Sequence, residues 1–358
     1  METEQKKVKK KLSTPKKILV GFLSALVLLI VGFGVFTLVK LYGMSMNAAR
    51  FVAKPTVSPY ATPDPGLQEA NDNLDLTRDW DSDLDPNLIY LDPIYVENAI
   101  DPDVVNILVI GEDDSLDAVN GRSDVTLIVS YNQRLHTVKT ISVLRDTWVY
   151  ISGRDRWNRI NAAYRFGGVG LAINTINENF GLDIQYYMKT DFNNLVSIID
   201  KLGGLDVPLS EEELAYYAKT HPNNPITGGE NGVYHLNGEQ VLAHVRNRTI
   251  GNGDWSRTER QRIVMNSLLK RARQEKDIVS LTSLIYSLTD YIDTNLSPWQ
   301  MISIGSGVVF GSNLNNTQKG TIPCTGSWNY AYEGSMAVIH IDLEKNRQWI
   351  RGFIYGVQ

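Results

Sequence analysis

Hydrophobic and polar positions divide the chain into three stretches of different character. An uncharged apolar run, Ile18–Val39, follows a lysine-rich start, and a segment rich in Pro, Asp and Asn follows it up to about residue 103. From Val104 onward, short β-branched runs alternate with longer stretches whose apolar residues recur at helical spacing. The first pattern is typical of strands and the second of helices.

Three strands are predicted first, at 104–111, 124–131 and 137–144. The connection at 132–134 is short enough for a hairpin, and the loop at 112–123 has no helix signal, so all three are expected to be antiparallel neighbours. Further strands are expected at 184–189, 321–324 and 337–341, and helices at 162–180, 191–202, 239–245, 255–273, 278–293, 298–309 and from Asp342. The predicted fold class is therefore α+β, an αβα-layered domain whose mixed, largely antiparallel central sheet is flanked by helices.

The helix at 191–202 carries the clearest local signals. Leu195, Ile198, Ile199 and Leu202 form one apolar face, Asp191 is in place to cap the N-terminus, and two glycines follow the last turn. We expect the helix to begin at Asp191 and to end at these glycines.

The apolar run near the N-terminus predicts an N-terminal transmembrane helix. At a rise of 1.5 Å per residue it would extend about 30 Å, the thickness of a bilayer's hydrocarbon core. A cleaved signal peptide is the alternative, but its apolar core is normally only about 7–15 residues long. Lysines are abundant before the run and scarce just after it, which places the N-terminus in the cytoplasm.

The predicted organisation is a single-pass protein of the cell membrane. Its parts are a cytoplasmic basic tail at 1–17, a membrane anchor at 18–41, an extracytoplasmic stalk at 42–103, a main domain at 104–275, and C-terminal helices and strands packed on it at 276–358. The whole chain has a net charge of −5 although its tail is basic, so the remainder is more acidic. An acidic exterior argues against nucleic acid as a partner. The single cysteine, Cys324, excludes an intramolecular disulfide and a cysteine-based zinc cluster.

Charged residues follow the ends of the predicted antiparallel strands. Because neighbouring strand ends meet at one edge of a sheet, these residues are expected to converge: Asp113, Asp114, Arg122, Asp124, Arg145 and Asp146. Carboxylates of this kind suit Mg²⁺, with water and substrate phosphate completing its coordination. The alternative is that these polar residues only end strands and cap turns.

A second basic cluster lies between residues 246 and 261. Arg246 and Arg248 are two apart and would point to the same side of an extended segment, whereas Arg257, Arg260 and Gln261 share one helical face near Asp254. Arginine forks and helix N-termini both favour phosphate. The alternative is an exposed basic helix.

Several short motifs occur in order within about residues 104–275: Asn106–Asp113, Arg122–Asp124, Ser142–Thr147, Arg159–Tyr164, Asp191–Phe192, Asp200–Val207, Arg246–Arg248 and Asp254–Gln261. Together they resemble the LytR-CpsA-Psr family of cell-envelope proteins. Two departures stand out. Asp114-Ser115 stands where the family usually has a nearby arginine, and Leu144 replaces the usual proline before Arg145.

The resemblance implies a phosphotransferase that moves a glycopolymer, such as teichoic acid or capsule, from polyprenyl (undecaprenyl) pyrophosphate to peptidoglycan. It implies that Asp113 and Asp124 hold Mg²⁺, with Mn²⁺ possible, and that five arginines grip the pyrophosphate: Arg122, Arg145, Arg246, Arg248 and Arg257. Arg260 and Gln261 would support them. Asp146 and Asp254 would orient arginines or take a proton. The expected catalytic residues are Asp113, Arg145, Arg246 and Asp146.

Two other functions are compatible with the same residues. One is a polyprenyl-pyrophosphate hydrolase with water as the acceptor, and the other is a non-enzymatic, lipid-binding envelope scaffold or regulator. A groove for the lipid could be lined by six apolar residues, although residues of this type also form ordinary core: Ala163, Leu171, Ile176, Leu195, Val196 and Ile199.

Overall fold

The computed structural model describes residues 94–96, 99–112 and 123–356. All of these belong to one compact unit within Asn47–Gln358. The predicted basic tail, the predicted anchor at 18–41 and almost all of the predicted stalk lie outside the described residues. Among the residues that are described, no helix has both the length and the apolar character needed to cross a bilayer.

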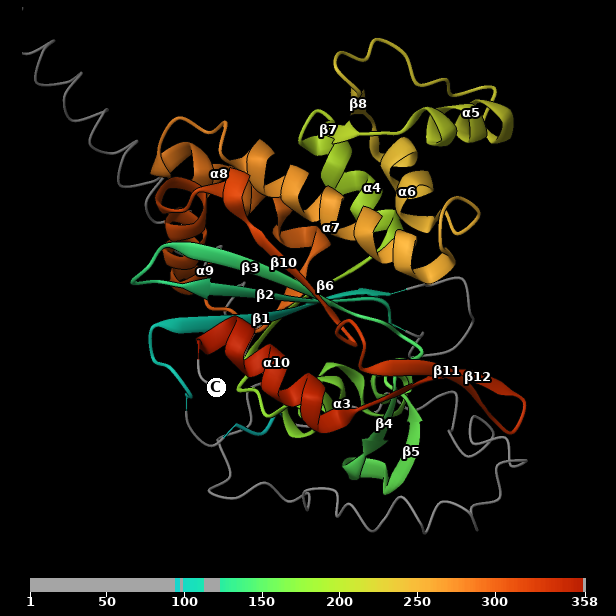
Figure 1. Ribbon diagram of the computed structural model, residues 1–358. Coiled ribbons are helices and arrows are strands. Elements are labelled where there is room, and N and C mark those ends of the chain that lie inside the picture. The colour runs from blue at the N-terminus through green and yellow to red at the C-terminus, as the bar shows by residue number, and fades with distance from the viewer. Residues whose placement is uncertain (1–93, 97–98, 113–122, 357–358) are drawn as a thin grey trace, which may run out of the picture. The chain divides into compact units, whose positions relative to one another are not determined.

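A six-stranded sheet forms the centre of the fold, with the strand order β10-β3-β2-β1-β6-β9 (Figure 1). Its strands are β1 (Val104–Glu112), β2 (Ser123–Asn132), β3 (Thr137–Val143), β6 (Tyr186–Asp191), β9 (Asp293–Thr294) and β10 (Gln318–Ile322). The predicted meander is confirmed, because β2 pairs antiparallel with both β1 and β3. β6 joins β1 in parallel, β10 joins β3 in parallel and β9 joins β6 antiparallel, so the sheet is mixed and mostly antiparallel, as predicted.

Helices cover both faces of this sheet (Figure 1). α3 (Asn161–Phe180) and α10 (Leu343–Tyr355) pack on one face, where Ile173 and Ile350 meet Leu108 and Ile128 in the main core. α7 (Gly253–Ala272), α8 (Ile278–Leu288) and α9 (Pro298–Ser306) lie over the other face. Strands buried on both faces are apolar along most of their length, which is why β1 and β2 are easy to detect in the sequence.

A second core cluster forms among shorter elements. α4 (Phe192–Lys201), α5 (Glu211–Thr220) and α6 (Gly238–Arg246) pack with α7 and with the hairpin of β7 (Leu205–Pro208) and β8 (Val233–Leu236). Asp191 caps α4 by accepting a hydrogen bond from the Asn194 N–H, and the chain leaves through Gly203 and Gly204 at positive φ. Both ends of this helix were predicted.

Several predicted boundaries differ from the structure, and two of the differences have a clear physical cause. The strand expected from residue 184 begins at Tyr186, because the Asn177 side chain holds both main-chain groups of Ile184 in a turn. The helix expected at 278–293 ends at Leu288, where a 3₁₀ turn, η4 (Thr289–Tyr291), leads into β9. There the pairing of β9 with β6 overrides helix propensity.

Several short elements have no counterpart in the sequence predictions. They are the hairpin of β4 (Trp148–Ile151) and β5 (Arg156–Arg159), the β7–β8 hairpin, α5, the strand β11 (Trp328–Glu333), and the 3₁₀ turns η3 (Ser152–Arg154) and η6 (Leu314–Asn316). The helix expected at 298–309 is found as α9, which ends at Ser306, followed by a π-helical turn, η5 (Gly307–Gly311). β11 pairs with the expected late strand β12 (Met336–Ile341). A signal for α5 was present, since Ser210 and Glu213 form a capping box at its start.

Candidate functional site

The end of β1, the start of β2 and the end of β3 lie at one edge of the sheet. Glu112 at the end of β1 pairs with Ser123 at the start of β2, and β3 ends two residues before Arg145. This register brings Asp124 and Arg145 together, as the sequence predicted, and Arg145 donates a hydrogen bond to Asp124. The predicted partners Asp113 and Arg122 lie outside the described residues.

Asp124 accepts hydrogen bonds from three arginines of separate segments. Arg145 Nη1 donates to Oδ1 at 3.1 Å, and the Nη2 atoms of Arg248 and Arg257 donate to Oδ2 at 3.2 and 2.7 Å. Burial alone would raise the pKa of Asp124, but the three guanidinium groups hold it below its ordinary value. Asp124 therefore stays ionised and fixes the arginines in place.

Asp254, in the first turn of α7, contacts the same arginines from the other side. Its Oδ2 accepts a hydrogen bond from Arg145 Nη2 at 3.2 Å, and its Oδ1 lies 3.7 Å from Arg248 Nε and 3.8 Å from Arg257 Nη1. We call Arg145, Arg248 and Arg257, together with Asp124 and Asp254, the arginine cluster. The predicted role of Asp254 in orienting arginines fits these contacts.

The side chains of the arginine cluster differ in their exposure to solvent. The Arg257 side chain is 3% exposed and the Arg248 side chain is 46% exposed. Burial lowers the pKa of Arg257, although Asp124 opposes the change. For Arg145, burial alone would lower the pKa, but Asp254, Asp146 and Asp124 raise it above its ordinary value. All three side chains can therefore present positive charge to an anion.

Two guanidinium N–H groups in the arginine cluster have spare donor capacity. The Nε atoms of Arg145 and Arg257 are buried and have no hydrogen-bond acceptor among the described residues. A buried donor without an acceptor costs about 1–3 kcal/mol, so such groups favour a ligand that supplies oxygen atoms. Phosphate oxygens match the arginine fork in both charge and geometry.

Asp146 extends the arginine cluster toward β5 and β12. Its carboxylate lies 3.6 Å from Arg145 Nε and 3.4 Å from Arg159 Nε. Burial raises the pKa of Asp146, both arginines oppose this change, and the neighbouring Asp254 adds to it, so the net shift is upward. A carboxylate with a raised pKa is suited to accept a proton, which is one of the two roles predicted for Asp146.

Arg246 differs from its prediction. It is the last residue of α6 and not part of an extended segment, so it does not follow the direction of Arg248. Its guanidinium lies 4.8 Å above the Phe192 ring. Phe192 directly follows Asp191, which pairs with Glu112 of β1, so Arg246 approaches the same sheet edge from the β6 side.

The contacts of Arg260 fit the supporting role predicted for it. Its three donor groups are used within the protein, on Glu213 Oε1 at 2.5 Å and on the carbonyl oxygens of Asn247 at 3.1 Å and Ile250 at 2.9 Å. These contacts brace the loop that carries Arg248, so Arg260 supports the arginine cluster indirectly. Gln261 remains a candidate, since its buried Nε2 has no acceptor among the described residues.

Three further charged residues stand at this edge without having been assigned a role. Arg159 donates to the Ala337 carbonyl oxygen and contacts Asp146, and Lys189 Nζ lies 3.6 Å from Glu112 Oε2. Arg159 and Glu112 both belong to motifs quoted above, so the sequence contained a signal for them. Lys189 had none, because its position depends on the parallel pairing of β6 with β1.

The described residues alone do not form a metal site. Within 94–96, 99–112 and 123–356 there is no group of three or more His, Cys, Asp or Glu side chains placed to hold a metal ion. Asp124 could supply one ligand, because its Oδ1 accepts a single hydrogen bond and a carboxylate oxygen has two lone pairs. A divalent cation would need the substrate's own phosphate oxygens as further ligands.

The apolar groove considered for a lipid is not formed by the six residues named for it. Ile176 belongs to the main core, Ala163 and Leu171 to a small separate cluster, and Leu195 and Ile199 to the core around α6. Five of the six residues therefore pack in three different core clusters, which supports the alternative that they form ordinary core.

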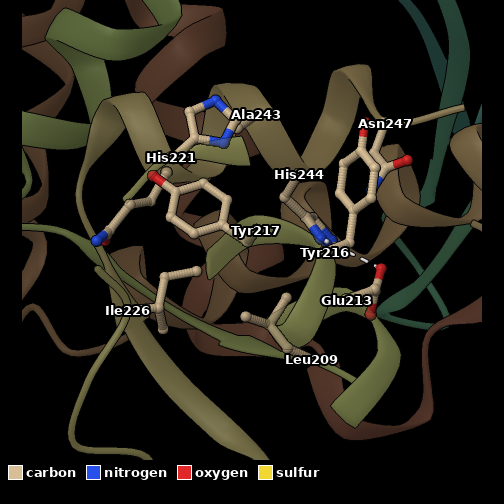
Figure 2. A pocket seen from close by; sticks show the side chains of 10 residues that line it. Leu209, Glu213, Tyr216, Tyr217, His221, Ile226, Ala243, His244 and Asn247 are labelled. Carbon is tan, nitrogen blue, oxygen red and sulfur yellow. Dashed lines mark ion pairs between the residues drawn. The ribbon is translucent and has the colours of Figure 1, made fainter. Parts of the chain in front are cut away.

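A small cavity lies between α5 and α6 and is lined in part by Asn247, the residue before Arg248. It has a volume of about 20 Å³ and is lined by residues that include Tyr217, His244 and Glu213. Figure 2 shows His244 directed at Glu213, whose Oε1 lies 3.5 Å from His244 Nδ1. The volume suits about one water molecule. The cavity therefore has no room for a glycan or a lipid.

An αβα domain that gathers arginines around buried carboxylates at one sheet edge is built to bind an anion such as phosphate. The chain belongs to the LytR_cpsA_psr family, whose sequence profile matches residues 82–347. The polyisoprenyl-teichoic acid–peptidoglycan teichoic acid transferase TagU of Bacillus mycoides (strain KBAB4) is 30% identical over 223 residues, 62% of this chain and 69% of the relative.

Solved structures share the fold. B. subtilis TagV superposes with a TM-score of 0.59 at 24% identity, over 72% of this chain and 99% of that chain. The family protein YwtF (TagT), determined with bound octaprenyl pyrophosphate lipid, superposes with a TM-score of 0.55 at 20% identity, over 73% and 94%. At these identities the likeness establishes the fold.

Proposed function

We propose that this protein transfers a glycopolymer from a polyprenyl pyrophosphate carrier to peptidoglycan. The observation that carries the proposal is the arginine cluster, where three arginines converge and the buried Nε–H groups of Arg145 and Arg257 have no acceptor within hydrogen-bonding distance among the described residues. The relative named as a teichoic acid transferase and the neighbour holding octaprenyl pyrophosphate support the same substrate class.

In the proposed reaction, a peptidoglycan hydroxyl attacks the phosphorus next to the glycan. A new P–O bond forms, the bond to the bridging oxygen breaks, and polyprenyl phosphate leaves. Phosphoryl transfer depends mainly on alignment and on stabilising charge on the phosphate oxygens. Arg145, Arg248 and Arg257 would bind those oxygens, and Asp146, whose pKa is raised by burial, would take the hydroxyl proton.

We also propose Mg²⁺, with Mn²⁺ as the alternative, as a cofactor assembled together with the substrate. Asp124 and Asp113 are the candidate carboxylate ligands, and a bound divalent cation would supply further neutralisation of phosphate charge. Removing divalent cations with EDTA should abolish transfer, and adding Mg²⁺ or Mn²⁺ should restore it.

The proposed location is the cell membrane, with the catalytic domain outside the cell. The apolar run Ile18–Val39 and the lysines before it support this placement. A protein anchored in this way would meet a lipid-linked donor at the membrane surface and peptidoglycan beyond it.

The direct test supplies the full chain with a polyprenyl-pyrophosphate oligosaccharide, Mg²⁺ and peptidoglycan oligomers. Covalent attachment of the oligosaccharide supports the proposal. Release of sugar phosphate without attachment would identify a hydrolase, and tight lipid binding without turnover would identify a scaffold or regulator.

The Arg248→Ala variant tests the site. Transfer should fall by about 100- to 1000-fold, because a donor to the phosphate oxygens is lost. The free energy of unfolding should change by less than about 1 kcal/mol, since the side chain is half exposed. The control is Arg134→Ala, which removes an exposed arginine paired with Asp103 at the opposite end of the β2–β3 hairpin. Equal activity of Arg248→Ala and the parent protein would remove the assignment.

A further inference from the structure

Four aromatic side chains gather next to the arginine cluster. Trp255 on α7 lies 4.9 Å from Trp328 on β11, ring centre to ring centre, and its Nε1 donates a hydrogen bond to the Tyr330 hydroxyl at 3.1 Å. Trp328 and Tyr330 meet edge to face at 5.1 Å. Tyr332 follows two residues later on β11. We call Trp255, Trp328, Tyr330 and Tyr332 the aromatic shelf.

The three rings of β11 lie on one face of the strand. Side chains two residues apart point the same way, so Trp328, Tyr330 and Tyr332 form a row. Tyr330 is 64% exposed and Tyr332 is 76% exposed. Figure 1 shows β11 and β12 extending as a hairpin from the rest of the described fold. Large aromatic residues exposed side by side on a projecting strand are unusual unless they bind something.

The aromatic shelf is physically continuous with the arginine cluster. Trp255 immediately follows Asp254, and the Asp146 carbonyl oxygen accepts a hydrogen bond from the Ile339 N–H of β12 at 2.9 Å. The Arg159 side chain donates to the Ala337 carbonyl oxygen, also on β12, while contacting Asp146. One end of a ligand bound to the aromatic shelf would therefore lie close to Asp146, the proposed proton acceptor.

The charge of the hairpin indicates a neutral ligand. Residues 328–341 contain Glu333 and no lysine or arginine. A surface of this kind attracts neither phosphates nor anionic lipid headgroups. On the face that carries the aromatic row, the tyrosine hydroxyls are polar groups that can exchange hydrogen bonds with sugar hydroxyls.

We propose that the aromatic shelf binds the sugar rings of the acceptor glycan strand and presents its hydroxyl to the arginine cluster. This inference rests on the proposed transferase function. The faces of pyranose rings carry C–H groups, which pack on the electron-rich face of an aromatic ring. The donor already has a pyrophosphate for the arginines to hold. The sugar backbone of the acceptor carries no phosphate and offers ring faces, hydroxyls and N-acetyl groups, which an aromatic row with neighbouring hydroxyls can recognise.

Direct binding tests the aromatic shelf without requiring turnover. The full chain is titrated calorimetrically with the tetrasaccharide of N-acetylglucosamine, an uncharged probe of glycan rings. The double variant Tyr330→Ala, Tyr332→Ala should bind at least about tenfold more weakly, because two stacking surfaces are lost. Both side chains are exposed, so the fold should persist. The matched control is Trp299→Ala, which removes a 68% exposed aromatic ring from α9. Equal binding by the double variant and the parent protein would overturn the proposal.

Steady-state transfer then separates acceptor from donor. In the double variant the KM for peptidoglycan oligomers should rise about tenfold, whereas the KM for the lipid-linked donor should stay unchanged. A rise confined to the donor KM would overturn the proposal and assign the shelf to the donor glycan. If the parent protein transfers nothing, the proposed function fails, and tetrasaccharide binding still decides whether the shelf holds sugar.

Discussion

Asp124 and Asp146 both contact Arg145, but their pKa values are shifted in opposite directions. Asp124 faces three guanidinium groups, and its pKa is held low even though burial acts to raise it. Burial raises the pKa of Asp146, Arg145 and Arg159 oppose this change, and Asp254 beside it adds to the rise, so the net shift is upward. Two carboxylates whose pKa values are pushed apart are suited to different tasks. Asp124, whose pKa is lowered, orients the arginines, and Asp146, whose pKa is raised, can exchange a proton.

The Asp146→Asn variant tests this division. A general base works in its deprotonated form, so the transfer rate of the parent protein should fall as pH decreases through the pKa of Asp146. The variant should be about 100- to 10,000-fold slower and should lack this acid limb in kcat/KM. Asp103→Asn, at the other end of β1, should retain both the rate and the limb. An acid limb that persists unchanged in Asp146→Asn would assign the proton to another group.

The role of a residue could be predicted from the sequence only in two cases. Either its interaction partner was close in the sequence, or the register of the predicted strands placed the partner beside it. Asp124 and Arg145 meet because β1, β2 and β3 form a meander, and the sequence shows that meander. Arg260 was predicted to support the other arginines, but its partner Glu213 could not be predicted, because the two residues are 47 positions apart in the sequence. Arg246 was misplaced because α6 continues to the arginine itself.

At the scale of elements, α5, α6 and α7 are joined by a charged junction beneath the Arg248 loop. Glu213 of α5 binds Arg260 of α7 and lies beside His244 of α6. Burial, aided by Arg260, lowers the pKa of His244 to about 4, although Glu213 opposes the shift. His244 is therefore neutral in the folded protein at neutral pH.

This junction predicts a loss of stability in mild acid. The unfolded chain binds a proton at His244 near its ordinary pKa of 6.5, but the folded protein does so only near 4. The contribution of this group is therefore complete above pH 6.5 and is lost as pH falls toward 4, by up to about 3 kcal/mol. In His244→Gln the decline in the free energy of unfolding between pH 6.5 and 4 should be shallower, as measured by urea denaturation. His221→Gln, at an exposed position, should decline like the parent protein; a matching decline in His244→Gln would contradict the assignment.

Elements were predictable where local chemistry decides them. α4 was found from its apolar spacing, its Asp191 cap and the glycines that end it. β11 was missed because Tyr330 and Tyr332 are exposed and Trp328 is only partly buried, so its pattern lacks the apolar positions that mark a buried strand. β9 consists of two residues, and only its pairing with β6 defines it.

At the scale of the whole molecule, the C-terminal segment completes the central domain. β10 is a strand of the central sheet, and α10 closes the main core with Ile350 and Ile354. Lys139 of β3 donates hydrogen bonds to the carbonyl oxygens of Phe353 and Ile354. Residues 104–275 without this segment would leave β3 unpaired along one side and a core face open to water.

The Ile350→Ala variant measures this dependence. Ile350 is fully buried against α3 and the sheet, so its truncation should lower the free energy of unfolding by about 2–5 kcal/mol. Gln348→Ala, on the exposed side of the same helix, should cost less than about 0.5 kcal/mol. Chemical denaturation of both variants gives the comparison. A loss below 1 kcal/mol in Ile350→Ala would show that α10 is dispensable.

The carboxylates built into the arginine cluster also affect how a substrate arrives. Within the described residues, Arg145, Arg248 and Arg257 stand beside Asp124, Asp146 and Asp254, so opposite charges nearly cancel a short distance away. Little field then reaches into solution, and stray anions are not drawn in from afar. Capture depends on direct contact with correctly spaced guanidinium groups. The rate of association with the substrate should accordingly be almost insensitive to ionic strength. The site then distinguishes a diphosphate from smaller anions only through direct contacts with the guanidinium groups.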